Sequence, residues 1–287
     1  TSLCLLGFIC LDWLFVAALP GFKKSFGPVK PVVLQLAILR GLVMLILPFL
    51  PSLVLQVIGT ALLIWGFWIE PHTIQVTHQT YETEKIPTGQ VIHLLQISDL
   101  HIEKNTRREN QLSELIQTLR PDLICFTGDI LNLSYLDNPT AHNQARDVLS
   151  KWHAPQGIFA VSGSPAVDLP DIFDSLIAGT NVHRLNNTCA VVQKKDGPTL
   201  NILGVTCSHV PHQDVPTAEN LLSGVDADHL NILLYHSPDV APALSTSGID
   251  LQLSGHTHGG QVRLPFLGAL VTGSLYGRAF QRSGRYE

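Results

Sequence analysis

Apolar residues dominate the first 70 positions of the chain and alternate with polar residues afterwards. The run Leu3–Leu19 is interrupted by a single charged residue, Asp12. It is just long enough to cross a hydrocarbon core of about 30 Å, so we predict a membrane-spanning helix. A cleaved signal peptide is the alternative, but the basic residues Lys23, Lys24 and Lys30 follow this run rather than precede it.

A second apolar run, Val32–Trp68, is too long for a single pass at about 1.5 Å per residue. Pro48 and Pro51 lie near its middle, and proline is disfavoured in a helix interior. We therefore predict two spans, near Val32–Leu47 and Ser52–Trp68. One long kinked or tilted helix is the alternative.

The charges of this region predict its orientation. Arg40 is costly inside a lipid-exposed span, so we expect it to face other helices, to pair with Asp12, or to extend to the interface. The loop that carries Lys23, Lys24 and Lys30 should lie in the cytoplasm, because cytoplasmic loops are enriched in basic residues. Three spans then place the following domain on the cytoplasmic face of the cell membrane, whereas two spans place it outside.

We therefore predict that residues 1–70 form an anchor of two to three transmembrane helices and that residues 71–287 form one domain. Short strands alternate with helices in this domain, and Glu103–Asn110 has the charged pattern of a loop. The expected strands are Thr73–Thr83, Val91–Ser98, Leu123–Thr127, Ile158–Ser162, Val182–Arg184, Thr188–Gln193, Leu200–Thr206 and Asn231–Tyr235. The expected helices are Gln111–Leu119, Ala141–Trp152, Pro170–Ile177 and Ala218–Leu222. This α/β pattern predicts two packed sheets flanked by helices.

Composition narrows the class of protein. Of the 287 residues, 45% are hydrophobic and 14% are charged, which is too apolar for an ordinary soluble enzyme. The formal net charge of -5 argues against nucleic acid as a partner, because that function needs a basic surface. The five cysteines lack the spacing of a metal site or a disulfide framework. Met44 is the only methionine, so we expect a chain that is trimmed at its start, and we also expect the domain to continue past Glu287.

Carboxylates and imidazoles recur where the predicted strands end. Asp99 and His101 follow one strand, Asp129 follows the next after a glycine, and His236 follows a third. In open α/β sheets, functional residues gather at the carboxyl ends of the strands. Each residue also has an ordinary structural alternative, such as a strand-end turn or a buried histidine. Their recurrence in one order is what argues for a shared site.

A fourth element completes this pattern between Leu253 and Leu264. His256 and His258 lie one residue apart between Gly255 and Gly259-Gly260, which permit a tight bend that turns both rings towards one point. Neutral imidazole is the commonest ligand for transition metals in proteins. Alone, two histidines in a Gly-rich loop are more often a solvated turn.

Together these motifs resemble the calcineurin-like metallophosphoesterase family, whose pattern is Asp-x-His, Gly-Asp, Gly-Asn-His-Asp/Glu, a single His, and Gly-His-x-His. They resemble most its membrane-anchored bacterial branch, in which the last motif reads Gly-His-Thr-His-Gly-Gly-Gln, and the likeness extends from about Ile74 to the end of the chain. It implies a four-layer αββα sandwich. It also implies that one metal is held by Asp99, His101 and His258, that Asp129 bridges, and that His236 and His256 hold a second metal.

Such a site fits phosphoester hydrolysis. Two divalent ions generate the nucleophile from water and neutralise charge on the phosphoryl oxygens. Mixed Asp and His ligands favour Mn, Fe or Zn over Ca and Mg, so we expect two divalent ions from that group.

One motif departs from the family. Where the family has Gly-Asn-His, this chain has Gly163-Ser164-Pro165. In the family, the Asn ligates the second metal and the His stabilises or protonates the leaving oxygen. Ser164 is a poorer ligand and Pro165 offers no donor. The candidate replacements are His209, His212 and Asp168, and we assign His209 a catalytic role together with Asp129.

We therefore predict a membrane-anchored phosphoesterase that cleaves a phosphomonoester, phosphodiester or pyrophosphate bond, with activity reduced by the altered motif. The alternative is a catalytically degenerate subunit of a membrane protein complex, whose partners would be other membrane subunits. For the enzyme, the expected partners are the lipid bilayer and a phosphorylated substrate, and the anchor favours a lipid-linked one.

Overall fold

The computed structural model describes residues 2–24, 27–194, 197–260, 263–264 and 266–280. The chain divides into two compact units. The first comprises residues 1–76 together with 103–112, and the second comprises residues 77–102 and 113–287.

Three helices make up most of the first unit, and each is long and apolar enough to span a membrane. They are α1 (Ser2–Ala18), extended by a 3-10 turn (Leu19–Phe22), α2 (Val29–Ile46), and α3 (Phe49–Ile64), extended by a π turn (Trp65–Ile69) and a 3-10 turn (Glu70–His72). The chain leaves α2 at Leu47, and α3 begins after Pro48 and runs back alongside α2. The structure therefore contains the two separate helices that the prolines predict, not one kinked helix.

A buried polar cluster joins the three helices at Arg40. Its guanidinium donates to both carboxylate oxygens of Asp12 on α1, at 2.5 and 2.7 Å. It also donates to the side-chain oxygen of Gln56 and to the hydroxyl of Thr60 on α3, at 2.8 and 2.9 Å. Gln56 donates back to the Arg40 carbonyl at 2.9 Å. Of the alternatives that the sequence left for Arg40, pairing with Asp12 is confirmed.

The first sheet of the second unit is parallel, in the order β1-β2-β3-β4. Its strands are β1 (Leu94–Ile97), β2 (Leu123–Phe126), β3 (Ile158–Ala160) and β4 (Val182–Arg184). The connecting helices α4 (Arg107–Leu119), α5 (Pro139–Leu149) and α6 (Pro170–Ile177) lie on one side of it, with a 3-10 turn (Leu133–Tyr135) before α5.

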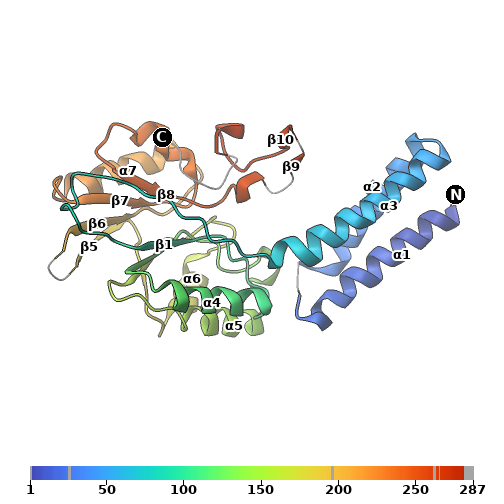
Figure 1. Ribbon diagram of the computed structural model, residues 1–287, viewed down its shortest axis with the longest axis horizontal. Helices are drawn as coiled ribbons and strands as arrows, with labels where there is room; N and C mark the ends of the chain where they lie inside the picture. The colour runs from blue at the N-terminus through green and yellow to red at the C-terminus, as the bar shows by residue number, and fades with distance from the viewer. Residues whose placement is uncertain (1, 25–26, 195–196, 261–262, 265, 281–287) are drawn as a thin grey trace. The chain divides into compact units, whose positions relative to one another are not determined.

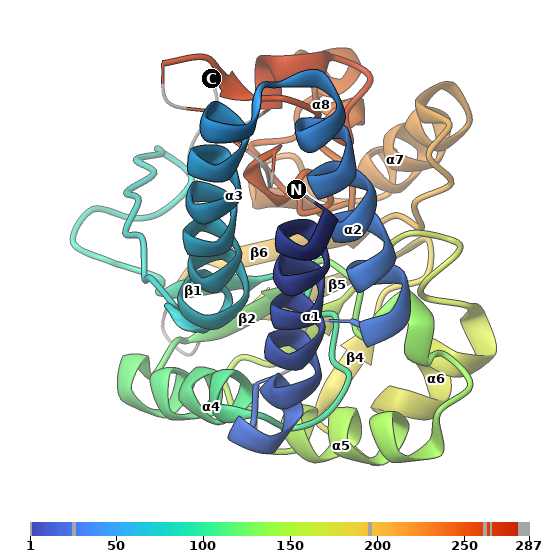
Figure 2. The same ribbon diagram turned by 90° about the vertical axis from the view of Figure 1, so that its right-hand side faces the viewer.

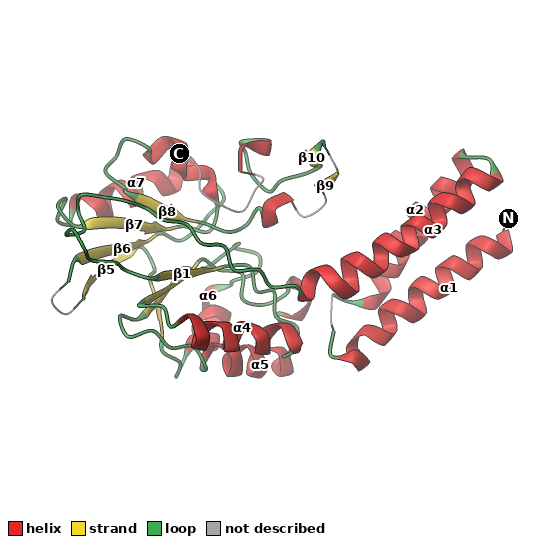
Figure 3. Cartoon of the chain, viewed as in Figure 1, coloured by secondary structure: helices red, strands yellow, loops and turns green. Residues whose placement is uncertain are grey.

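The second sheet has the order β5-β6-β7-β8, with β5 antiparallel to β6 and the other pairs parallel. Its strands are β5 (Thr188–Gln193), β6 (Thr199–Gly204), β7 (Leu230–Leu234) and β8 (Leu251–Leu253). Helices α7 (Pro211–Ser223) and α8 (Ala241–Leu244) cover its outer face, through a cluster that includes Leu203, Leu233 and Tyr235. The remaining elements are 3-10 turns (Pro238–Val240, His258–Gly260 and Gly277–Phe280) and the antiparallel pair β9 (Arg263–Leu264) and β10 (Gly268–Ala269), all visible in Figure 3.

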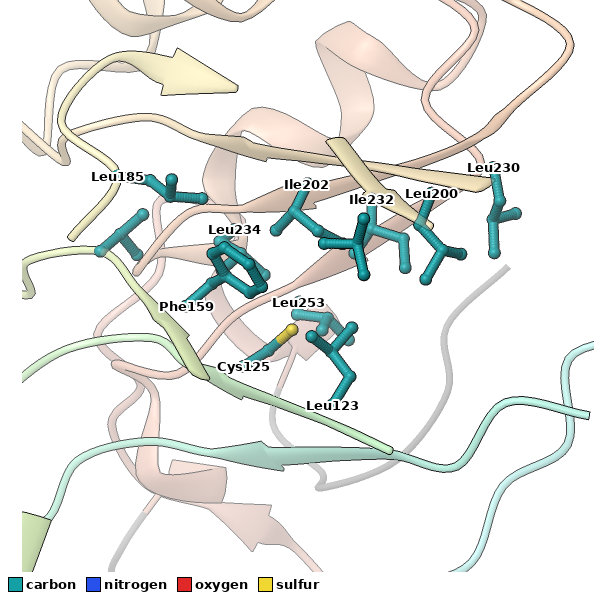
Figure 4. Close-up of a cluster of buried hydrophobic side chains, with 12 residues drawn as sticks. Leu123, Cys125, Phe159, Leu185, Leu200, Ile202, Leu230, Ile232, Leu234 and Leu253 are labelled. Atoms are coloured by element: carbon teal, nitrogen blue, oxygen red, sulfur yellow. The ribbon is translucent and has the colours of Figure 1, made fainter. Parts of the chain in front are cut away.

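The main hydrophobic core lies between the two sheets. Cys125 and Phe159 of the first sheet pack against Ile202, Ile232 and Leu234 of the second (Figure 4). With helices outside each sheet, the layers are helix, sheet, sheet, helix. The α/β architecture predicted from the sequence is confirmed.

Three local predictions were wrong. Thr73–Thr83 is not a strand, because its mostly polar, exposed residues have no strand beside them within the described chain. α4 begins at Arg107 rather than Gln111, because Glu109 accepts from the Thr106 backbone N–H at 2.7 Å and so caps the first turn. α7 begins at Pro211, seven residues before the predicted start at Ala218, because proline fits the first helical turn.

Candidate metal centre

Parallel pairing brings the strand-end residues to one edge of the two sheets. Asp99 follows β1 and Asp129 follows β2, which pairs with β1 in parallel. His236 follows β7, and His256 follows its parallel partner β8. The sheets then pack face to face, so residues far apart in the sequence meet.

One group of potential metal ligands contains Asp99, His101 and His258. The Nε2 atoms of His101 and His258 are 3.1 Å apart, and His258 Nε2 is 3.3 Å from Asp99 Oδ1. One ligand atom from each residue therefore lies close enough for all three to hold a single ion.

A second group contains Asp99, Asp129 and His236. Asp129 Oδ2 lies 3.5 Å from His236 Nε2 and 3.7 Å from His101 Nε2, so one carboxylate oxygen faces both groups. His256 belongs to neither group, but its ring lies nearby, with its centroid 5.1 Å from that of His236. All six residues predicted as metal ligands thus lie in one cluster.

Hydrogen bonds orient these side chains. His236 Nδ1 lies 2.6 Å from the Thr127 carbonyl, which leaves Nε2 directed at Asp129. The backbone N–H of His256 donates to both oxygens of Asp99, at 3.1 and 3.0 Å. The loop that carries one imidazole therefore positions the carboxylate from another strand.

The backbone of the cluster is strained. Five of the predicted ligands have a positive φ: Asp99 (53°), His101 (44°), Asp129 (60°), His256 (69°) and His258 (48°). Non-glycine residues rarely adopt this conformation, and each instance costs on the order of 1 to 3 kcal/mol. Packing of the two sheets holds these residues in a geometry that their local preference opposes.

Two glycine contacts explain how the loops approach so closely. A Cβ on Gly128 would lie 2.3 Å from the Gly163 backbone, and a Cβ on Gly255 would lie 2.2 Å from Asp99 Oδ2. Any side chain at these positions would push the loops apart.

The altered motif also reaches the cluster. The Ser164 hydroxyl lies 3.3 Å from Asp129 Oδ2 and 3.2 Å from His236 Nε2, and the Ser164 N–H donates to Asp129 Oδ1 at 2.7 Å. The shorter Ser side chain thus lies beside the second group, where the family has Asn. Pro165 is exposed in the turn that follows.

Asp168 has a role that sequence reasoning missed. Its buried carboxylate accepts from the backbone N–H groups of Asp129, Ile130 and Gly163, at 2.7, 3.1 and 2.7 Å. It therefore fixes two loops of the cluster to each other and does not present its carboxylate to a leaving group. An acidic residue four positions after Ser164 was the available signal, but its direction was not readable from the sequence.

Of the two other candidates to replace the Asn and His of the family motif, His209 lies in the cluster. Its ring centroid lies 4.4 Å from that of His256 and 6.1 Å from that of His236, and its backbone φ is 61°. His212, in contrast, lies exposed in the first turn of α7.

The pKa shifts of the clustered side chains differ in direction from residue to residue. Burial would raise the pKa of Asp99, but the hydrogen bond with His258 and the nearby His236 outweigh it and hold the pKa at about 2. Burial, with His236 and His209 nearby, lowers the pKa of His256 to about 4. Burial also lowers the pKa of His209. Near neutral pH the Asp99 carboxylate is ionised and the His256 ring is neutral, which are the forms that ligate metals. The pKa values of His236 and His258 are instead raised, because Asp129 and Asp99 favour their protonated forms more than burial opposes them. Mixed oxygen and imidazole donors at this spacing fit divalent transition metals.

Known proteins share this region. Residues 92–260 match the family model described as calcineurin-like phosphoesterase. The chain is 33% identical to the uncharacterised metallophosphoesterase YkuE of Bacillus subtilis, over 77% of this chain and 76% of that protein. It is 31% identical to an uncharacterised metallophosphoesterase of Aquifex aeolicus, over 67% and 72%. It is 23% identical to the UDP-2,3-diacylglucosamine pyrophosphatase LpxG of Chlamydia trachomatis, over 71% and 74%.

Proposed function

Because the chain belongs to the calcineurin-like phosphoesterase family, we propose that it is a membrane-anchored, metal-dependent hydrolase of a phosphomonoester, phosphodiester or pyrophosphate bond. The observation that carries this proposal is the convergence of six carboxylates and imidazoles from four strand ends, five of them on strained backbone. A chain without a reaction to perform has no chemical reason to retain that strain.

In this proposal Asp99, His101 and His258 hold one metal, and His236 and His256 hold the second. Asp129 bridges, consistent with its Oδ2 facing both His101 and His236. The metals would be Mn, Fe or Zn. When bound, they would supply an activated water and neutralise charge on the phosphoryl group.

His209 would contact the leaving oxygen in place of the missing family histidine. Its ring lies against His256, so it borders the same site. Because burial lowers its pKa, the ring is mostly neutral at neutral pH and would act by donating an N–H hydrogen bond. Full proton transfer would be less effective, so poor leaving groups should react slowly.

The substrate class follows from the relative with a named activity. LpxG is a UDP-2,3-diacylglucosamine pyrophosphatase, so its substrate joins a diphosphate to an acylated sugar. Three candidate spans in the present chain favour a substrate that also resides in the membrane. We propose a lipid-linked phosphate or diphosphate.

The membrane arrangement is part of the proposal. Residues 1–70 would form a multi-pass anchor, and residues 71–287 would form the phosphoesterase domain at the cytoplasmic face of the cell membrane. The basic loop between α1 and α2 supports this side. Protease cleavage of the domain in right-side-out vesicles, but not in inside-out vesicles, would contradict it.

One observation favours the alternative of a catalytically degenerate subunit of a membrane complex. Ser164 and Pro165 replace the two family residues that act on the second metal and on the leaving group. Under this alternative the chain would bind one metal or none and would hydrolyse no phosphate ester.

A restored motif tests the proposal against this alternative. We would compare the wild type with the double variant Ser164→Asn and Pro165→His, each loaded with Mn, on aryl and alkyl phosphates. A general acid contributes about 10²- to 10⁴-fold, and mainly for poor leaving groups, so alkyl turnover should rise more than aryl turnover. His209→Asn, made without the two motif substitutions, should lower the turnover of alkyl phosphates. Two bound metals without hydrolysis in any variant would contradict the enzyme assignment.

A further inference from the structure

The loop between β6 and α7 carries His209 to the metal centre. Residues 205–210 belong to no helix or strand, so no regular backbone pairing fixes this loop. The backbone φ of His209 is 61°, in the left-handed region. A non-glycine residue keeps this conformation only where the surrounding structure holds it there. Side-chain contacts must therefore supply the support.

Asp214 is the side chain that fixes the loop. It lies in the first turn of α7 and is 8% exposed. Its Oδ2 atom accepts from both the backbone N–H and the hydroxyl of Ser208, each at 2.8 Å. The Ser208 hydroxyl in turn accepts from the Val210 N–H at 3.1 Å. The residues on either side of His209 are thus tied to one buried carboxylate.

Tyr235 connects the same carboxylate to the second sheet. Its hydroxyl donates to Asp214 Oδ2 at 2.6 Å, and its side chain is fully buried. Tyr235 directly follows β7 and directly precedes the predicted ligand His236. Asp214 therefore joins the loop that carries His209 to the strand end that presents His236. Asp168 joins two loops of the cluster in the same way on the first sheet.

A buried thiol sets which nitrogen of His209 faces the site. Cys207 is 1% exposed, and its Sγ atom lies 3.7 Å from His209 Nδ1. This contact leaves Nε2 as the nitrogen that can face the cluster. The ring centroid lies 4.4 Å from that of His256, so the imidazole borders the metal centre in a defined orientation.

We propose that Asp214 and Tyr235 are positioning residues, which hold the His209 ring where it contacts the leaving oxygen. This inference rests on the proposed hydrolase function and names the groups that set the geometry of its leaving-group contact. A buried carboxylate is stable only while its hydrogen bonds are made, so the three donors on Oδ2 lock the loop to the sheet. If Asp214 served only to stabilise the start of α7, the bonds to Ser208 would suffice and the bond to Tyr235 would have no effect on hydrolysis.

A double-mutant cycle tests whether these residues act through His209. Asp214→Ala and Tyr235→Phe would each be made in the full chain, with and without His209→Asn, and assayed with Mn on methyl phosphate and p-nitrophenyl phosphate. Each should lower kcat for methyl phosphate by about 10- to 100-fold, because a misplacement of about 1 Å can cost about 100-fold. Turnover of p-nitrophenyl phosphate should change little, because its leaving group departs without protonation.

In the His209→Asn background neither substitution should lower turnover further, since the ring that they position is absent. The same loss with and without His209, or equal losses on both esters, would show a general structural role and overturn the proposal. Tyr235→Phe nearly preserves the volume of the buried side chain, so it carries the test if Asp214→Ala does not fold.

Asp250→Ala is the matched control. Asp250 Oδ2 also accepts from a residue of β7, the Asn231 N–H at 2.7 Å, and from Lys85 at 2.7 Å, but at the end of the strand away from His236. This variant should leave turnover of both esters unchanged. A selective loss on methyl phosphate equal to that of Asp214→Ala would overturn the proposal.

Structures of the metal-loaded variants separate this inference from the hydrolase function. In Tyr235→Phe the His209 ring should move by more than about 1 Å from its position beside His256, and in Asp250→Ala it should stay. An unmoved ring in Tyr235→Phe would overturn the positioning role. A displaced ring, with no hydrolysis by any variant or by the wild type, would refute the hydrolase function but leave the positioning role standing.

Discussion

Two buried polar clusters in this chain differ in how their polar groups are satisfied. In the proposed anchor, Arg40 donates hydrogen bonds to Asp12, Gln56 and Thr60 from regular helices. In the candidate metal centre, imidazole nitrogens lie close together, as at 3.1 Å between His101 and His258. Five of the six predicted ligand residues have a positive φ.

This difference distinguishes a cluster with a structural role from a cluster that could bind a ligand. The anchor cluster contains its own cation, so its carboxylate is neutralised within the chain. The metal centre brings together carboxylates and imidazoles, whose oxygen and unprotonated nitrogen atoms are electron-pair donors, and a bound cation is the group that would satisfy them together. Carboxylates and imidazoles crowded together on strained backbone therefore indicate a ligand site, whereas an ion pair on regular helices indicates a structural cluster.

The largest effect should come from breaking the anchor cluster. Arg40→Met leaves the Asp12 carboxylate buried without its cation, which should cost about 3 to 5 kcal/mol of stability. Unfolding in detergent micelles measures it. The double variant Asp12→Leu and Arg40→Met removes both charges and should recover most of the loss. Equal destabilisation of single and double variants would show that packing, not charge, is decisive.

In the metal centre the corresponding change is Asp129→Asn. Because this carboxylate faces both ligand groups, its neutralisation should release both metals rather than one. Substitutions that only support a ligand cost about 10- to 100-fold, so we expect turnover to fall by at least about 100-fold. Metal analysis of the purified variant measures occupancy, and undiminished occupancy would exclude the bridging role.

The buried carboxyl group of Asp168 should make the free energy of unfolding depend on pH. Burial raises its pKa to about 6 from 3.8, although the Gly163 N–H opposes the shift. The folded state therefore holds this proton more tightly than the unfolded state. The protonated Asp168 side chain therefore contributes about 1 to 3 kcal/mol to the free energy of unfolding. This contribution is fully present below about pH 4 and is lost as the pH rises through about 6.

Denaturant unfolding of the chelator-treated protein between about pH 4 and 7 measures this slope. Asp168→Asn removes the titrating group, so the variant should lack the decline that the wild type shows in this window. Superimposable pH profiles of the two proteins would refute the assignment.

The smallest expected effects on stability come from a glycine-to-alanine substitution made once in each cluster. At Gly255 an alanine Cβ would lie 1.8 Å from Ser98 Oγ, so Gly255→Ala should cost about 1 to 3 kcal/mol and weaken metal binding. At Gly59 on α3 the nearest atom, Arg40 Nη1, is 3.7 Å away, so Gly59→Ala should stabilise the helix by about 0.5 to 1 kcal/mol. Opposite signs in unfolding experiments would support the comparison, and losses of equal size would contradict it.

Hydrophobic patterning alone predicted much of the fold. β4, β5 and α6 have their predicted bounds, because Asn and Gly residues flank the two strands and Pro170 begins the helix. The break between α2 and α3 was likewise predictable from Pro48 and Pro51, whose rings disfavour a helix interior. Helix starts were less predictable. The start of α4 depends on a hydrogen bond between Thr106 and Glu109, both of which look like loop residues in the sequence.

The sequence by itself determined which residues are available for chemistry, since residue type and motif order mark Asp99, Asp129, His236 and His256 as ligand candidates. Only the tertiary structure decided what Asp168 and His209 do, because their directions depend on loops from different strands. Asp168 accepts hydrogen bonds from backbone N–H groups, and the ring of His209 lies in the cluster. Local sequence fixes the chemistry of a side chain, but long-range packing of the two sheets fixes where it points.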